Sequence, residues 1–227
     1  MDEIVTRLAR LDCCAVSDAM DKLGITGRVA SGLEQRATTQ RIAGRVVTYR
    51  LVPVADAPPP TNPPRHLGTT AIDSASPGDV IVVEQRTGID AGSWGGILTL
   101  GAKVRGIAGV IVDGPVRDID EARAYGFPVY CSTLTARTAR GRVAEIECNG
   151  PVSIRGVSVT PGDYVIADAS GVAFVARDDV ERVLEAAEAI AARESAMAKA
   201  LLAGQAITQV MGADYEHMLR KPQKEHK

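Results

Sequence analysis

The chain has 227 residues, 45% of them hydrophobic and 24% charged, which is ordinary for a globular protein of one large domain or two small ones. Its formal net charge of −2 argues against nucleic acid as the main partner, because there is no basic excess to displace counterions. No apolar run approaches the roughly 18 residues of a membrane-spanning helix. The N-terminus also lacks the apolar core of a signal peptide. We therefore expect a cytoplasmic protein with no membrane partner.

The N-terminal part of the chain predicts two helices, over residues 2–10 and 15–23. In the second, apolar residues recur at helical spacing. Ser17 and Asp18 offer side chains that can cap this helix, and Gly24 ends it.

A strand and a proline-rich segment follow. Residues 42–52 are rich in β-branched side chains and predict a strand. Residues 55–66 hold five prolines in twelve positions, which removes backbone donors and excludes regular structure. This segment is interpreted as an exposed loop, either a plain insertion or a lid.

Two blocks of the sequence resemble each other, SPGDVIVVE (76–84) and TPGDYVIAD (160–168). Each begins with a Pro-Gly turn and continues into an apolar strand. Further strands are expected at 109–113, 127–131, 142–147, 151–158 and 172–176, and helices at 96–105, 117–125, about 178–202 and 206–219. The pattern predicts a β-rich α/β core followed by a helical extension.

The cysteines do not indicate a metal site. Cys13, Cys14, Cys131 and Cys148 form no CxxC pair, and His66, His217 and His226 are scattered along the chain. We interpret the cysteines as small apolar core residues in a reducing compartment.

The residues most informative about function lie between positions 92 and 125. A loop with Gly92, Gly95 and Gly96 precedes a predicted helix, and successive N–H groups at such a helix N-terminus form an anion site. The loop lacks the GxxxxGK[ST] pattern of a nucleotide P-loop, so a small carboxylate suits it better than a triphosphate. After the next strand come Arg117 and Asp118, which we expect at the same edge of the sheet as the loop.

The acidic residues after that strand are compatible with an oxygen-ligated metal such as Mg²⁺ or Mn²⁺. Asp118 and Glu121 are three positions apart and share a helix face, whereas Asp120 points elsewhere. A simpler interpretation is that Asp118 caps its helix and Arg117 pairs with Asp113 or Glu121. On local sequence alone, both interpretations stay open.

The spacing of these residues resembles a known pattern. Gly96, twenty residues, Arg117-Asp118, two residues and Glu121 follow the G-x20-R-D-x2-[ED] motif of the RraA-like family, which includes the class II 4-hydroxy-4-methyl-2-oxoglutarate / 4-carboxy-4-hydroxy-2-oxoadipate aldolases. The blocks AVSDAMDKLG, RIAGRVVTY, SPGDVIVVE, RGIAGVIVDGPVRDIDE and TPGDYVIADASGVAFV also resemble this family and together span about residues 10–205.

The resemblance implies a fold. It is an RraA-like swivelling β/α sandwich with a central β core and a C-terminal helical extension. We expect a single domain over 1–227, with the core at about 10–177 and the helices at about 178–219. The resemblance also implies a homotrimer or a hexamer with active sites at subunit interfaces.

The resemblance assigns roles to particular residues. Asp118 becomes the direct metal ligand, and Glu121 acts through metal-bound water. Arg117 contacts the keto oxygen of a pyruvyl unit. The loop amides around Gly95, Gly96, Ile97 and Leu98 hold a carboxylate.

The resemblance bears on two further positions. An acid from a neighbouring subunit's C-terminal helix completes the site in the family, and Glu194 is the candidate here; an exposed helix charge is the alternative interpretation. Some relatives carry an acid where this chain has Gly96, which bears on the choice of aldol substrate.

The implied activity is that of a metal-dependent lyase. It is a class II pyruvate aldolase with oxaloacetate decarboxylase activity, acting on a small oxoacid. A Schiff-base mechanism is the weaker alternative, because Lys103 is expected in solvent on the helix after the loop. The alternative of another class is a protein-binding regulator of ribonuclease activity, as some family members are.

Overall fold

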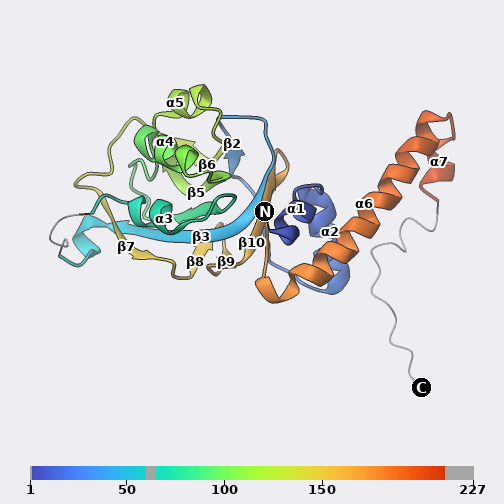
Figure 1. Ribbon diagram of the computed structural model, residues 1–227, viewed down its shortest axis with the longest axis horizontal. Coiled ribbons are helices and arrows are strands. Elements are labelled where there is room, and N and C mark those ends of the chain that lie inside the picture. The colour runs from blue at the N-terminus through green and yellow to red at the C-terminus, as the bar shows by residue number, and fades with distance from the viewer. Residues whose placement is uncertain (1, 60–64, 213–227) are drawn as a thin grey trace, which may run out of the picture.

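A computed structural model describes residues 2–59 and 65–212. Figure 1 shows a long curved sheet with one group of helices packed over its left half and another group at its right end. The helices are α1 (Glu3–Leu8), α2 (Cys13–Leu23), α3 (Thr69–Ser74), α4 (Gly96–Val104), α5 (Ile119–Ala124), α6 (Val180–Leu202) and α7 (Ile207–Val210), with short 3-10 turns at Val54–Asp56 and Arg177–Asp179. The strands are β1 (Val29–Ala30), β2 (Glu34–Gln35), β3 (Ile42–Pro53), β4 (Val80–Glu84), β5 (Gly109–Val116), β6 (Val129–Leu134), β7 (Val143–Cys148), β8 (Val152–Ile154), β9 (Val157–Val159), β10 (Tyr164–Asp168) and β11 (Gly171–Val175).

Strand β3 joins the two halves of the main sheet. The strands run in the order β1-β11-β10-β3-β4-β5-β6-β2, and β7 pairs with the far end of β3. Strands β3 to β6 are parallel to one another, whereas β10, β11, β1, β7 and β2 pair antiparallel. Strands β8 and β9 form a separate hairpin. The α/β class with a central β core and a C-terminal helical extension is thus confirmed.

The two similar Pro-Gly blocks become the strands on either side of β3. Block 76–84 forms a turn and then β4, which pairs parallel to β3, and block 160–168 forms a turn and then β10, which pairs antiparallel to it. The two similar blocks therefore flank one central strand but run in opposite directions.

The sheet separates distinct apolar cores. One lies under α3, α4 and α5 and includes Trp94, Leu98 and Phe127. The opposite face of the same parallel strands packs on the β8–β9 hairpin, with Ile111 and Ile154 at its centre. A third core joins α1, α2 and α6 to β10 and β11. Burial on both faces explains the continuous apolar runs of β4 and β5.

Several element predictions need correction. Helix α2 begins at Cys13 rather than residue 15, because Asp12 accepts a hydrogen bond from the Ala15 amide and caps it, not Ser17 or Asp18. The strand predicted at 151–158 is two strands, because Arg155 (φ 50°) and Gly156 (φ 89°) form a tight hairpin turn.

The proline-rich segment and the chain end are partly described. Residues 55 and 56 of the expected loop belong to the 3-10 turn Val54–Asp56, and 60–64 lie outside the described residues. The last predicted helix, 206–219, is represented by α7, and its part beyond residue 212 lies outside the described residues. The single-domain division at about residue 178 stays a prediction.

The structure bears on the predictions about membrane-spanning helices and about the cysteines. Within residues 2–59 and 65–212, no helix is long and apolar enough to cross a membrane. All four cysteines are free thiols, but Cys14 is exposed rather than a core residue.

Candidate functional site

The candidate site is built where two loops meet beyond the ends of β4 and β5. After β4 the chain turns out of the sheet and returns alongside the end of β5. Here the Ser93 amide donates to the Pro115 carbonyl (2.8 Å) and the Arg117 amide donates to the Trp94 carbonyl (3.0 Å). This pairing places the glycine loop directly beside the Arg-Asp turn. The expected meeting of the two segments at one sheet edge is therefore present.

Buried aromatic residues hold the loop in place. The indole N–H of Trp94 donates to the Thr99 hydroxyl of α4 (2.8 Å), and its ring stacks on Phe127 at 6.4 Å between centroids. The hydroxyl of Tyr49, on β3, donates to the Ser93 carbonyl (2.6 Å). Because these groups are fully or almost fully buried, the backbone before α4 is fixed from below.

The three glycines of the loop leave room for the charged side chains. A Cβ at Gly92 would lie 2.9 Å from Cγ of Arg117, and one at Gly95 would lie 2.9 Å from Oδ2 of Asp118. A Cβ at Gly96 would lie only 1.8 Å from Oε2 of Glu121. Any larger residue at these positions would have to displace a charged side chain.

Asp118 joins the two loops through its carboxylate. Its Oδ2 accepts a hydrogen bond from the Gly96 amide (3.0 Å), and both of its oxygens accept from Nε of Arg117 (3.1 Å each). Asp118 adopts the left-handed conformation (φ 57°), which is unusual for a residue other than glycine and directs the carboxylate away from its own helix. The carboxylate is about one third exposed, so it remains open to a ligand.

Glu121 completes a group of two carboxylates at the N-terminus of α4. Its Oε atoms lie against the α-carbon of Gly96, while Asp118 lies against the amide of the same residue. Asp120 is instead 91% exposed and pairs with Arg123 (2.8 Å) in solvent, as expected from its helix position.

The donor set is small but compatible with a hard divalent ion. Among the described residues, no cluster of three or more His, Cys, Asp or Glu side chains is present. Mg²⁺ typically takes one or two carboxylates and keeps several waters, so two carboxylates converging beside a missing Cβ fit such an ion. A zinc site with three or four protein ligands does not fit these residues.

The simpler interpretation of the Arg-Asp pair is wrong in its details. Asp118 stands at the N-cap position of α5 but makes no side-chain hydrogen bond to that helix. It caps α4 instead. Asp113 is bound by the Arg155 amide (2.7 Å), not by Arg117, whose only ion pair among the described residues is with Asp118.

The other predicted site residues differ in their exposure and in their distance from the loop. Leu98 is buried under the loop, whereas the Ile97 side chain is 82% exposed. Lys103 is exposed at the end of α4, as expected. Glu194 lies on α6, where burial and the neighbouring Asp12 and Asp18 raise the pKa of its carboxyl. Within one chain, α6 lies far from α4 and α5 (Figure 1).

Sequence reasoning missed a support behind the loop. Glu145, on β7, accepts a hydrogen bond from the Gly68 amide (2.6 Å) at the start of α3. Burial raises the pKa of the Glu145 carboxyl. A Cβ at Gly68 would lie 3.2 Å from the Leu98 side chain and 3.3 Å from the Tyr49 hydroxyl. A single acid in an alternating strand gives no signal of this contact.

Comparison with known proteins agrees with this arrangement. Residues 13–174 match the family described as RraA-like, Aldolase/RraA. The chain belongs to the RraA-like family. The matched residues include the whole glycine loop and the Arg-Asp turn.

Named relatives span different lengths. The chain is 31% identical over 201 residues to "Putative 4-hydroxy-4-methyl-2-oxoglutarate aldolase" of Halalkalibacterium halodurans, covering 88% of this chain and 89% of that protein. It is 29% identical over 209 residues to Protein DlpA of Legionella pneumophila, covering 92% of this chain but only 33% of DlpA. The chain thus spans about a third of the length of that relative.

Solved structures share the fold along most of the chain. An uncharacterized protein from Pseudomonas syringae pv. tomato has a TM-score of 0.81 at 26% identity, covering 92% of this chain and 96% of that one. Streptomyces coelicolor RraAS2, described as an unusual member of the RNase ES inhibitor RraA protein family, has a TM-score of 0.74 at 25% identity, covering 86% and 95%.

Proposed function

We propose that this protein is a divalent-metal-dependent carbon–carbon lyase. Its substrates would be 4-hydroxy-2-oxo acids of the 4-hydroxy-4-methyl-2-oxoglutarate type, from which it releases pyruvate, and oxaloacetate, which it decarboxylates. The observation that carries the proposal is the convergence of Arg117, Asp118 and Glu121 on the N-terminus of α4 at Gly96. The aldolase name of a relative that matches 88% of the chain supports the same substrate class.

The proposed metal is Mg²⁺ or Mn²⁺, held by Asp118 directly and by Glu121 through water. When bound, such an ion polarises the 2-keto oxygen of the substrate as a Lewis acid. The first N–H groups of a helix have no partner within that helix. That of Gly96 donates to Asp118, and those of Ile97 and Leu98 remain for the substrate carboxylate.

Arg117 would stabilise the charge that develops during either reaction. Both C–C cleavage and decarboxylation leave an electron pair that becomes the enolate of pyruvate. Arg117 uses Nε for Asp118, and among the described residues its terminal nitrogens make no hydrogen bond or ion pair. Those nitrogens are therefore available to the keto oxygen. The enolate is then protonated at C3 to give pyruvate.

Retro-aldol cleavage also needs a base, whereas decarboxylation does not. The base removes the proton of the 4-hydroxyl group as the C3–C4 bond breaks, leaving a carbonyl product beside pyruvate. We propose Glu194 of a second copy of the chain for this role. The raised pKa of its carboxyl suits an acid–base group.

The first test measures pyruvate release. With Mg²⁺ or Mn²⁺, the purified protein is expected to release pyruvate from oxaloacetate and from 4-hydroxy-4-methyl-2-oxoglutarate. EDTA is expected to abolish this activity, and Asp118→Asn should lower it on the order of 100-fold or more, because the metal loses its only direct ligand. Asp120→Asn is the matched control, since this neighbouring carboxylate lies in solvent. Full activity in Asp118→Asn would refute the assignment.

The alternative is a protein-binding regulator of ribonuclease activity. It is favoured by the likeness to the RraA member of Streptomyces coelicolor. The two functions are separated by assaying pyruvate release and RNA cleavage on the same preparation. Inhibition of a ribonuclease by a protein that turns over none of the oxoacids would replace the lyase assignment.

A further inference from the structure

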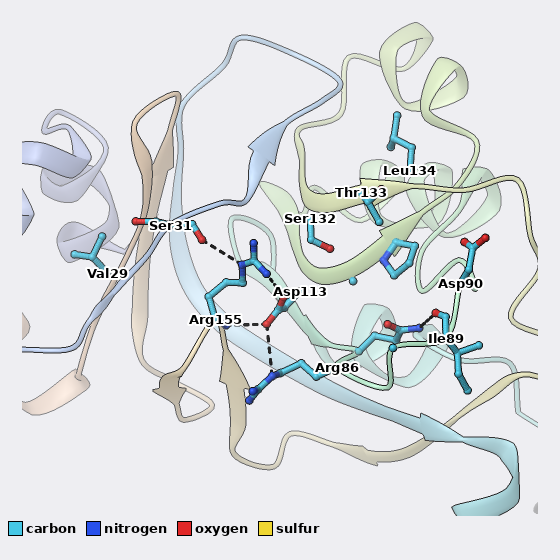
Figure 2. Close-up of a pocket in the computed structure, with 14 residues that line it drawn as sticks. Val29, Ser31, Arg86, Ile89, Asp90, Asp113, Ser132, Thr133, Leu134 and Arg155 are labelled. Carbon is cyan, nitrogen blue, oxygen red and sulfur yellow. Dashed lines mark hydrogen bonds and ion pairs between the residues drawn. The ribbon is translucent and has the colours of Figure 1, made fainter.

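A cavity of about 950 Å³ opens at the carboxyl ends of the parallel strands β4, β5 and β6. This edge of an open parallel sheet is where α/β proteins commonly bind ligands. The side chains of the Arg-Asp motif and the residues of the loop Gly95–Leu98 do not line it. Figure 2 shows Arg86 and Arg155 on opposite sides of Asp113 at one end of the cavity, with Ser132 and Thr133 nearby.

The Asp113 end of the cavity and the proposed metal site lie on opposite faces of β5. Asp113 follows Ile111 by two residues and shares its face, which packs on the β8–β9 hairpin. Trp94 and Val116, beside the motif, belong to the core under α4 and α5. The two arginines therefore stand on the other face of β5 from Arg117 and Asp118, although the far end of the cavity, at Ile89 and Pro115, adjoins the glycine loop.

Arg155 is fixed by its turn conformation and by hydrogen bonds from its amide and its guanidinium group. Its backbone adopts the left-handed conformation (φ 50°), which is unfavourable for arginine, and its amide donates to Oδ2 of Asp113 (2.7 Å). Its side chain lies over Gly32 and donates to the carbonyls of Ser31 (3.2 Å) and Gly32 (3.1 Å). Residues held in such conformations concentrate at binding sites.

At this end of the cavity, Arg86 and Arg155 lie beside the carboxylates of Asp113 and Glu84, which are paired neighbours on β5 and β4. Nη1 of Arg155 lies 3.8 Å from Oδ1 of Asp113, and Nε of Arg86 lies 4.0 Å from Oδ2. Both distances exceed a hydrogen bond, so these guanidinium N–H groups are not consumed by the carboxylate. Glu84 accepts a hydrogen bond from the Ser153 amide (2.7 Å), and Nη1 of Arg86 donates to the Ser153 hydroxyl (2.8 Å). The guanidinium donors of Arg86 and Arg155 that these contacts leave unused line the cavity.

The remaining wall suits hydroxyl groups. Ser31, Ser132 and Thr133 supply hydroxyls, and Asp90, at the far rim, is an exposed acceptor that pairs with Arg137 (3.2 Å). We propose that this cavity binds a small hydroxylated oxoanion, a carboxylate or a phosphate, with the anionic group on the donors of Arg86 and Arg155 that Asp113 does not use. Arginine favours such oxoanions because its planar donors match their geometry.

Binding is tested by isothermal titration with inorganic phosphate and with gluconate at constant ionic strength, and sorbitol serves as the uncharged control. Saturable binding of at least one anion and none of sorbitol is expected. Gluconate alone would assign a carboxylate ligand, and phosphate alone would assign a phosphate. Absence of saturable binding of both anions would overturn the proposal.

Substitutions locate the site. Arg155→Asn removes the guanidinium while asparagine tolerates the left-handed turn position, so this variant is expected to fold. It should raise the Kd at least about tenfold, as should Arg86→Gln, because each removes a charged donor. Arg182→Gln is the control, because Arg182 lies on α6 away from the cavity, pairs with Asp179 and loses the same charge.

The site is distinguished from the proposed metal site by a further variant. Asp118→Asn is expected to bind the same anion with an unchanged Kd, whether or not the protein is a lyase. Loss of binding in Asp118→Asn, or unchanged binding in both arginine variants, would place the anion elsewhere and overturn the proposal.

Discussion

Gly96 is the residue at which the candidate site is most sensitive to size. Its amide binds Asp118, and the space of its missing side chain holds the carboxylate of Glu121. Glycine is therefore required here for close approach and not for an unusual backbone angle. An acid at this position would occupy the place that Glu121 takes in this chain. One position therefore decides how the second carboxylate is supplied.

Replacing Gly96 by alanine should separate activity from stability. The new Cβ would meet Oε2 of Glu121 at 1.8 Å, and this flexible side chain can swing away at little cost in folding energy. Activity is expected to fall about 100-fold, because displacement of a reacting group by about 1 Å has that effect. Steady-state pyruvate release and urea unfolding measure the two quantities.

Gly101 provides the matched control for this substitution. It lies one helix turn further along α4, where a Cβ would find only Ile72, at 3.9 Å. Gly101→Ala should therefore keep activity and raise the free energy of unfolding by roughly 0.5–1 kcal/mol. Equal activity in both variants would show that Glu121 has no part in the site.

At the residue scale, the motif could be predicted from sequence, but its contacts could not. One strand separates the loop at Gly96 from the turn at Arg117 and Asp118. This order of neighbouring elements can be recognised in the sequence. That Asp118 caps α4 rather than α5 depends on its left-handed backbone. Nothing in the sequence indicates that this aspartate adopts a left-handed backbone. The sequence alone therefore leaves both interpretations open.

At the element scale, the short helix α3 supports the loop before α4. Its first turn is tied to β7 by the hydrogen bond from the Gly68 amide to Glu145, and Gly68 lies against Leu98 and Tyr49. Tyr49 in turn holds the Ser93 carbonyl. The partly buried carboxylate of Glu145 therefore supports the loop of the candidate site through α3.

Stability should depend on pH through Glu145. Burial raises the pKa of this carboxyl, so its ionisation opposes folding. The stability it contributes is present below the ordinary value of 4.5 and is lost as pH rises through the raised pKa. Glu145→Gln keeps an acceptor for the Gly68 amide without the charge. It should therefore gain stability relative to wild type as the pH rises above the ordinary value of 4.5.

Urea unfolding of both proteins at each pH measures this difference. Glu185→Gln, at an exposed position on α6, is the control for the loss of one carboxylate. If Glu145→Gln and Glu185→Gln have the same pH dependence, burial of Glu145 is not the cause.

Elements with strong periodicity could be predicted, and tightly turned ones could not. The apolar runs of β4, β5 and β10 and the helical pattern of α6 are present where expected. The sequence predicts one strand where the hairpin β8–β9 lies, because the hairpin turn holds arginine where asparagine or glycine is usual. The contact of Arg155 with Asp113 and Gly32 compensates for this choice, and such tertiary contacts are invisible in the sequence.

At the scale of the whole molecule, the two helical layers lie at opposite ends of the sheet. Helices α3 to α5 cover the parallel strands, whereas α6 packs on α2 and projects beyond it (Figure 1). The far end of α6 and α7 exposes apolar side chains, namely Leu201, Leu202, Ile207 and Met211. Glu194, near this end, cannot reach Arg117 of its own chain. Its proposed role therefore requires a second copy.

A shared site predicts that two inactive variants restore activity together. Asp118→Ala lacks the metal ligand but keeps Glu194, and Glu194→Gln lacks the base but keeps the metal ligand. In a head-to-tail ring of three chains that contains both, about one site in three combines an intact Asp118 with an intact Glu194. Aldol cleavage by mixed oligomers, co-expressed with different tags and purified through both, should then reach about a third of the wild-type rate.

The oxaloacetate reaction is the internal reference for this experiment. Decarboxylation needs no base, so Glu194→Gln should retain it while losing aldol cleavage. A mass in solution that corresponds to one chain would contradict a shared site, as would mixed oligomers that stay as inactive in aldol cleavage as each parent. Retained aldol cleavage in Glu194→Gln alone would instead assign the base to another residue, because the metal ligands and Arg117 would then suffice with a group of the same chain.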